Sequence, residues 1–133
     1  MNPYSPARRA YAESTIMTAS QEQLVVMLYD GAIRSLRQSA EAMRTGDRER
    51  SRNRMRAGEA IIDELNGSLD MGQGQIPSRL RSIYLYCKRL LILANVETDA
   101  GAIDTVVRLL SELRDAWAEI VRTSDREPHP QTA

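Results

Sequence analysis

Apolar residues recur in steps of three and four over four long stretches of the chain, and this spacing is that of one face of an α-helix. The sharpest stripe lies near the C-terminus and consists of Ile103, Val106, Leu110, Leu113, Trp117 and Ile120. The alternation in steps of two that indicates a half-buried strand does not occur in the sequence. The pattern therefore predicts an all-α chain with helices at about residues 21–44, 48–69, 77–96 and 100–121, and with Trp117 buried.

Start and stop signals support the first two of these helices. Ser20 and Gln23 have the spacing of a capping box, in which each side chain accepts a hydrogen bond from the other residue's backbone N–H. Gly46 suits the position just after a helix, where a positive φ favours glycine. Asp47 follows directly and is expected to cap the second helix.

The third and fourth helices have weaker start signals. Pro77 is expected at the first helical position, where a proline loses no helical hydrogen bond, and Asp99 can cap the fourth helix. Four helices of about five or six turns with short connections indicate an antiparallel up-down four-helix bundle. We expect the bundle to span residues 20–121, with an N-terminal arm over residues 1–19 and a disordered tail over residues 122–133.

Charge and cysteine content narrow the class of protein. Lys plus Arg and Asp plus Glu each number 18, so the formal net charge is zero and no general nucleic-acid or membrane-surface binder is indicated. No stretch approaches the roughly 18 apolar residues of a membrane-spanning helix. One cysteine, Cys87, excludes an internal disulfide and suits a reducing cytosol.

The sequence lacks the combinations of side chains that catalysis or metal binding would need. The chain has a single histidine, His129, so a di-iron bundle with its two Glu-x-x-His pairs is excluded. Cys87 falls on the predicted core face of the third helix, where a free thiol packs as a small apolar group. We therefore expect no enzyme, no cofactor and no metal site.

An arginine-rich stretch at the start of the second helix leaves an RNA-binding bundle open as an alternative. On a helical wheel, Arg48, Arg52 and Arg56 lie on one side of the core stripe, and Arg50 and Arg54 lie on the other. Arginines that straddle a buried face are typical of aliphatic stems covering the edge of a core. The solvated-face interpretation is therefore preferred over a nucleic-acid site.

The first and third helices carry more apolar residues than a one-sided stripe needs. On the third helix the surplus consists of Leu85, Tyr86, Ile92, Leu93 and Val96, with Arg89 among them, and on the first it includes Leu24, Met27 and Ile33. A bundle of this size cannot bury every side of two helices, so the surplus predicts a contact surface for a protein partner. The alternative is a homodimer interface of a structural or regulatory bundle.

Several motifs, in order along the chain, resemble those of the FliS family of flagellar secretion chaperones. Residues 18–32, TASQEQLVVMLYDGA, are similar to the family's opening TASPxxLxxMLYDGA. Gly46-Asp47 matches its first turn between helices, and residues 113–117 match its LRDAW. The run of Tyr84, Tyr86, Arg89, Leu91, Ala94, Asn95 and Asp99 is similar to its LYDYMxRRLxxANxxxD. Departures are Leu85 for Asp, Cys87 for Met, Leu90 for Arg and Gln21 for Pro.

The resemblance implies a function. Members of this family are antiparallel helix bundles that bind the disordered C-terminal segment of flagellin in the cytosol. They prevent its premature polymerisation and pass it to the membrane export gate. The surplus apolar residues would then contact cargo, and so would Tyr11, Ile16 and Met17 of the N-terminal arm, which we expect to cover the groove when cargo is absent.

Overall fold

The computed structural model describes the backbone of residues 20–126 and the side chains of residues 20–123. This part of the chain contains helices and turns and no strand, which confirms the predicted all-α fold. The helices are α2 (Gln21–Arg44), α3 (Arg48–Gly67), α4 (Gln75–Glu97) and α5 (Ala100–Arg126). The expectations for residues 1–19, including Tyr11, Ile16 and Met17, and for residues 127–133 lie outside the described residues.

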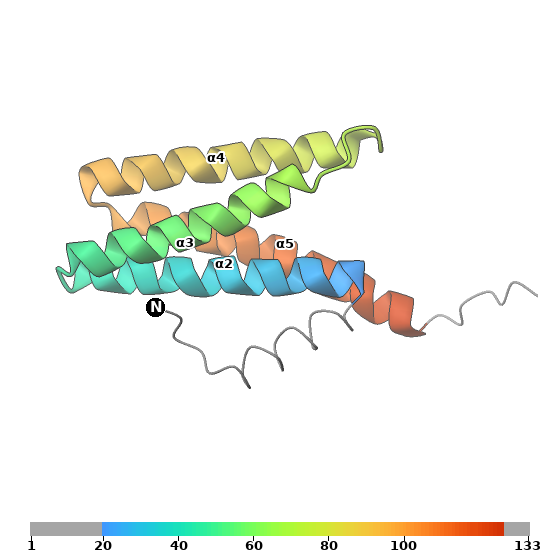
Figure 1. Ribbon diagram of the computed structural model, residues 1–133, viewed down its shortest axis with the longest axis horizontal. Helices are drawn as coiled ribbons and strands as arrows, with labels where there is room; N and C mark the ends of the chain where they lie inside the picture. Colours follow the sequence, from blue (N-terminus) through green and yellow to red (C-terminus); the bar gives the residue numbers. More distant parts are fainter. Residues whose placement is uncertain (1–19, 127–133) are drawn as a thin grey trace, which may run out of the picture.

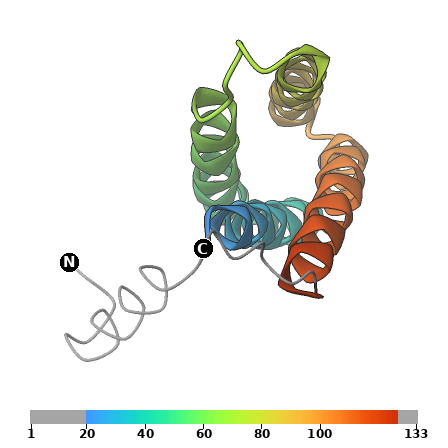
Figure 2. The same cartoon turned by 90° about the vertical axis from the view of Figure 1, so that its right-hand side faces the viewer.

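The helices run in alternating directions and form a bundle (Figure 1). Seen end-on, they occupy four corners in the order α2, α3, α4, α5, so that α2 and α4 lie diagonally opposite each other (Figure 2). Helix α2 packs extensively against both α3 and α5, whereas α4 touches α5 and α3 more sparsely. The bundle therefore has one well-covered helix and one loosely covered helix.

The local signals at the first two helices are confirmed. The backbone N–H of Ser20 donates to Gln23 Oε1 over 2.8 Å, and the N–H of Gln23 donates to Ser20 Oγ over 3.2 Å, which completes the capping box. Gly46 has φ +83°, the left-handed conformation expected after a helix. The side chain of Asp47 accepts the N–H of Arg50 over 3.1 Å and caps α3.

The later helix ends differ from the prediction in two places. Helix α4 begins at Gln75, so Pro77 stands at the third helical position and not the first. A proline is still tolerated there, because the first backbone N–H groups of a helix have no helical acceptor. Asp99 does accept the N–H of Gly101 over 3.0 Å at the start of α5. Helix α5 continues to Arg126 instead of ending at residue 121, so residues 122–126 are helical and not part of a tail.

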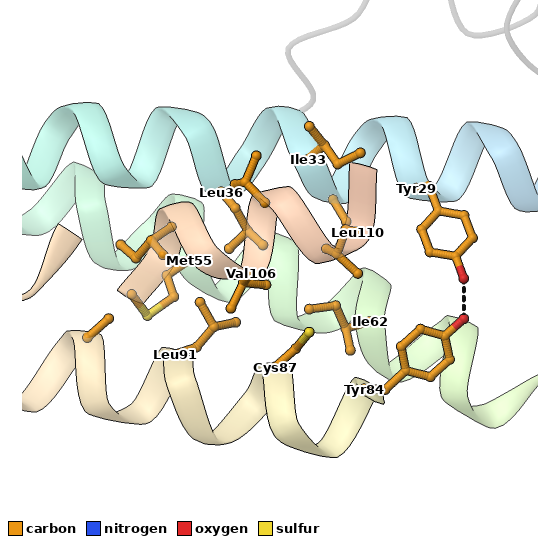
Figure 3. Close-up of a cluster of buried hydrophobic side chains, with 14 of the residues drawn as sticks. Tyr29, Ile33, Leu36, Met55, Ile62, Tyr84, Cys87, Leu91, Val106 and Leu110 are labelled. Atoms are coloured by element: carbon orange, nitrogen blue, oxygen red, sulfur yellow. Dashed lines mark hydrogen bonds between the residues drawn. The ribbon is translucent and has the colours of Figure 1, made fainter. Parts of the chain in front are cut away.

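The core fills the space between the four inner faces (Figure 3). Its largest fully buried apolar side chains are Tyr29, Leu36, Ile62, Leu65, Tyr84, Leu91, Ile103, Val106 and Leu110. Cys87 is also buried, as predicted, and burial raises the pKa of its thiol to about 11. The free thiol is therefore protonated and acts as a small apolar group.

Two residues of the α5 stripe are less buried than the sequence predicts. Trp117 is only partly buried, although it packs against the core, and Ile120 is 49% exposed. Trp117 borders a hollow at this end of the bundle together with Val25 and Leu80, and the helix continues from there to Arg126. Among residues 20–123, the periodic stripe of α5 therefore extends further along the helix than its fully buried part.

Two polar pairs fix how α2 sits in the bundle. The hydroxyl groups of Tyr29 and Tyr84 form a hydrogen bond across the core between α2 and α4 (Figure 3). Ser39 Oγ donates to the carbonyl oxygen of Ser51 over 2.7 Å, and Ser51 Oγ donates to that of Ser39 over 3.0 Å, which joins α2 to α3. Buried hydroxyl groups need such partners, because an unpaired one costs free energy.

Candidate partner-binding surface

The large apolar side chains that the core leaves exposed lie mainly on the outer side of α4. We call Leu85, Tyr86, Ile92, Leu93 and Val96 the α4 outer stripe; these five side chains are between 40% and 76% exposed. Their spacing places them on one side of the helix, and exposed Arg89 lies among them. All six were predicted as partner-binding residues, and the structure brings them together on one surface.

The stripe is exposed because the opposite side of α4 already supplies the core. Leu80, Tyr84, Cys87, Leu91 and Ala94 face inward and are buried. Helix α4 stands at a corner with neighbours only toward α3 and α5, so within residues 20–126 no helix covers its outer side. A helix that is apolar on two opposite sides is normally covered on both, which makes the outer stripe a candidate contact surface.

The first helix does not extend this surface. Ile33 was predicted to contact a partner, and this is wrong, because the side chain is only 6% exposed and belongs to the core. The physical reason is that α2 has close neighbours on two sides, so a wider arc of its side chains is buried. Leu24 is partly buried and Met27 is exposed.

Met27 also lies on a different side of the molecule from the α4 outer stripe. Tyr29 points across the core toward Tyr84 of α4. A residue two positions earlier in a helix is turned by about 200°. Met27 therefore points away from α4, and the predicted combination of the first and third helices into one surface does not form.

A groove between α3 and α4 runs along one edge of the outer stripe. It has a volume of about 410 Å³ and is lined by Arg52, Met55, Arg56, Glu59, Leu91, Ile92, Asn95 and Val96. Met55 and Leu91 are buried beneath it, while Ile92 and Val96 of the stripe form one side. Figure 1 shows α3 crossing α4 at an angle, with the wider separation at the end where α3 begins.

A second hollow lies at the other end of the bundle and was missed by the sequence analysis. It has a volume of about 260 Å³, and its apolar lining consists of Val25, Leu65, Leu69, Ile76, Pro77, Leu80, Tyr84 and Trp117. Gln21 and Glu22, at the start of α2, lie at its edge. The apolar pair Ile76-Pro77 after a turn with two glycines is the sequence signal at this place, and it is not enough to predict a hollow whose walls come from four separate helices.

The chemical groups of the described side chains suit contacts with a partner more than catalysis. Residues 20–123 contain no group of three histidine, cysteine or acidic side chains close enough to hold a metal ion. Burial raises the pKa of the phenols of Tyr29 and Tyr84, so both stay neutral. Among the helices between residues 20 and 126, none combines the length and the apolar character that crossing a membrane requires.

Comparison with known proteins relates the chain to one family. The family model described as flagellar protein FliS matches residues 3–124. The chain is similar to a Bacillus subtilis protein named flagellar secretion chaperone FliS, with 30% identity over 128 residues, which cover 96% of this chain and 92% of the relative. Relatives of the same name from Salmonella typhimurium and Escherichia coli are 37% and 33% identical over 84% of this chain, covering 87% and 86% of their own length.

Proposed function

The chain belongs to the FliS family of flagellar secretion chaperones, and from this premise we propose that it binds the C-terminal segment of flagellin in the cytosol. Binding would prevent flagellin from polymerising before export, and the loaded chaperone would deliver its cargo to the flagellar export gate. A family of chaperones also bears out the prediction that the chain is not an enzyme.

The observation that supports this proposal is the exposed α4 outer stripe. Five large apolar side chains on one side of a single helix exceed the scattered exposure that is normal on a protein surface. A disordered cargo segment can order itself only if it buries its own apolar side chains, and the stripe offers the surface for this. Ordering the segment uses part of the contact energy, which keeps the complex releasable.

On this surface, Tyr86 of the stripe and the neighbouring Arg89 are the residues best suited to anchor cargo. Tyr86 combines a large exposed ring with a hydroxyl group, and side chains of this kind dominate the energetics of many interfaces. Arg89 is exposed among the apolar side chains and can donate several hydrogen bonds. Leu24 and Met27 of α2 remain proposed contacts, and so do Tyr11, Ile16 and Met17 of the N-terminal arm.

Co-expression with the flagellin of the same organism, followed by size exclusion and a binding titration, tests the proposal. Leu85→Asp and Ile92→Asp each place a charge on the stripe, so we expect each to weaken flagellin binding by about tenfold or more, the scale of an interface hot spot. Ala60→Asp is the matched control. Ala60 is exposed on α3, two residues before buried Ile62 and so on the opposite side of that helix.

The folded state of each variant is checked by its circular dichroism spectrum and melting temperature. Normal flagellin binding by both stripe variants would show that cargo does not use the α4 outer stripe. No binding by the wild-type chain would contradict the proposed cargo itself.

A homodimer that uses the same stripe is the second candidate, because a second copy could bury these side chains as well as cargo could. Light scattering on the purified chain distinguishes the two. A stable dimer that Ile92→Asp dissociates, with no flagellin binding, would favour the dimer.

A further inference from the structure

The groove between α3 and α4 has a basic side that the apolar stripe does not explain. Arg52 and Arg56 line it one helical turn apart, so their backbone positions are separated by about 6 Å along the axis of α3. Among residues 20–123, no carboxylate oxygen lies within salt-bridge distance of either group, whereas Arg44 and Arg114 are each paired with an aspartate. Like charges at this spacing destabilise a helix slightly.

The opposite side of the groove repeats the same spacing with apolar groups. Ile92 and Val96 are also one turn apart, and they are 62% and 76% exposed. Buried Met55 and Leu91 lie between the two sides. The groove therefore presents an apolar row on α4 and a basic row on α3, each one helical turn long.

We propose that this groove receives an amphipathic helix that carries carboxylates, four residues apart, along one border of its apolar face. The apolar face would cover Ile92, Val96 and the floor, and the carboxylates would face Arg52 and Arg56. The inference rests on the proposed function, because it names the chemistry of the cargo segment that binds beside the α4 outer stripe.

The charge of the α3 side changes along the groove, and this sets where along the groove the carboxylates of the incoming helix bind. Glu59 follows Arg56 in the lining, and Asp63 one turn later is paired with Lys88 of α4 over 2.5 Å. A carboxylate on the partner is attracted at the Arg52 end and repelled at the Glu59 end. Complementary charge of this kind sets orientation and association rate more than affinity.

Nucleic acid fits the groove less well than a peptide does. Single-stranded nucleic acid is bound by basic grooves with aromatic side chains on which the bases stack. The side opposite the arginines is formed by aliphatic Ile92 and Val96, with Asn95 between them. The formal net charge of the chain is also zero.

The inference is tested with two synthetic peptides of about 18 residues, or five helical turns. Both carry the same leucine face, and one has glutamates and the other lysines along its border. Their affinities are measured by fluorescence anisotropy for the full chain, for R52Q/R56Q and for R50Q/R54Q. The last variant is the matched control, because Arg50 and Arg54 have the same spacing on the other side of α3 and line a different surface.

We expect the wild-type chain to bind the glutamate peptide about tenfold more tightly than the lysine peptide at low salt, as two exposed ion pairs allow. The preference should fall to about twofold in R52Q/R56Q, remain in R50Q/R54Q, and shrink as salt is added. Ile92→Asp should weaken the binding of both peptides.

Three results would overturn the inference. Equal affinity of the wild-type chain for the two peptides would show that the groove has no charge preference. If R50Q/R54Q lost the preference as much as R52Q/R56Q does, the preference would be an effect of net charge and not of the groove. Tighter binding of an oligouridylate than of the glutamate peptide through Arg52 and Arg56 would assign the groove to nucleic acid. Flagellin binding by the same variants is measured in parallel, so that the proposed function can stand when the inference fails.

Discussion

Helices α2 and α4 occupy opposite corners of the bundle and differ in what happens to their surplus apolar residues. Both carry apolar residues beyond a single stripe. Helix α2 lies between two closely packed neighbours and buries Ile33 in addition to Leu36 and Tyr29. Helix α4 has sparser neighbours and leaves the outer stripe exposed. The difference shows that surplus apolar residues stay exposed only on a helix whose neighbours do not cover them.

The largest expected effect comes from placing the same charge on each of these helices. Ile33→Asp introduces a carboxylate at a core position of α2, and we expect it to lower the free energy of unfolding by about 3 kcal/mol. Ile92→Asp on the outer stripe should change it by less than about 0.5 kcal/mol. Urea titrations of both variants measure the difference. Equal destabilisation would mean that the two helices are covered alike.

The next largest effect is expected from a substitution at the point where α3 lies closest to α2. A Cβ atom added at Gly58 would lie 2.7 Å from Leu36 Cγ, which is too short for a real contact. Gly58→Ala should therefore destabilise the bundle by about 2 kcal/mol through overpacking, even though alanine favours a helix over glycine by about 1 kcal/mol.

Gly67→Ala is the control for this substitution. A Cβ atom at Gly67, in the last turn of the same helix, would meet nothing within 4 Å. A Gly58→Ala variant as stable as wild type would show that α2 and α3 can separate, which would weaken the contrast with α4.

The smallest effect concerns the hydrogen bond that joins the two helices. Tyr84→Phe removes one hydroxyl group and leaves that of Tyr29 unpaired in the core, so we expect a loss of about 1 kcal/mol. The double variant with Tyr29→Phe leaves no unpaired group and should lose less than the sum of the single variants. Additive losses would show that the two helices are not coupled through this pair.

The same pair gives the bundle a predicted sensitivity to alkali. Burial raises the pKa of both phenols above the ordinary value of 10.0, so the folded chain keeps protons that the unfolded chain releases. The free energy of unfolding should therefore be unaffected by these groups below about pH 10 and should fall as the pH rises further. In the double phenylalanine variant the fall should be smaller.

The sequence by itself determined the features that depend on neighbours along the chain. The capping box of Ser20 and Gln23, the positive φ of Gly46 and the cap by Asp47 each involve residues within a few positions of one another. The inner faces of the helices, including Cys87 of α4, follow from periodicity alone. The α4 outer stripe could be named from the same periodicity, since its members share one side.

Only the tertiary structure decided which surplus side chains are covered. Ile33 and Ile92 both fall outside the predicted core stripe of their helix, yet one is buried by α3 and α5 around it and the other is exposed. Ile120 continues a regular stripe and is nevertheless 49% exposed. The groove beside Arg52 and Arg56 depends on how α3 crosses α4. Burial is a property of residues distant in sequence that meet in space, and periodicity within one helix does not contain that information.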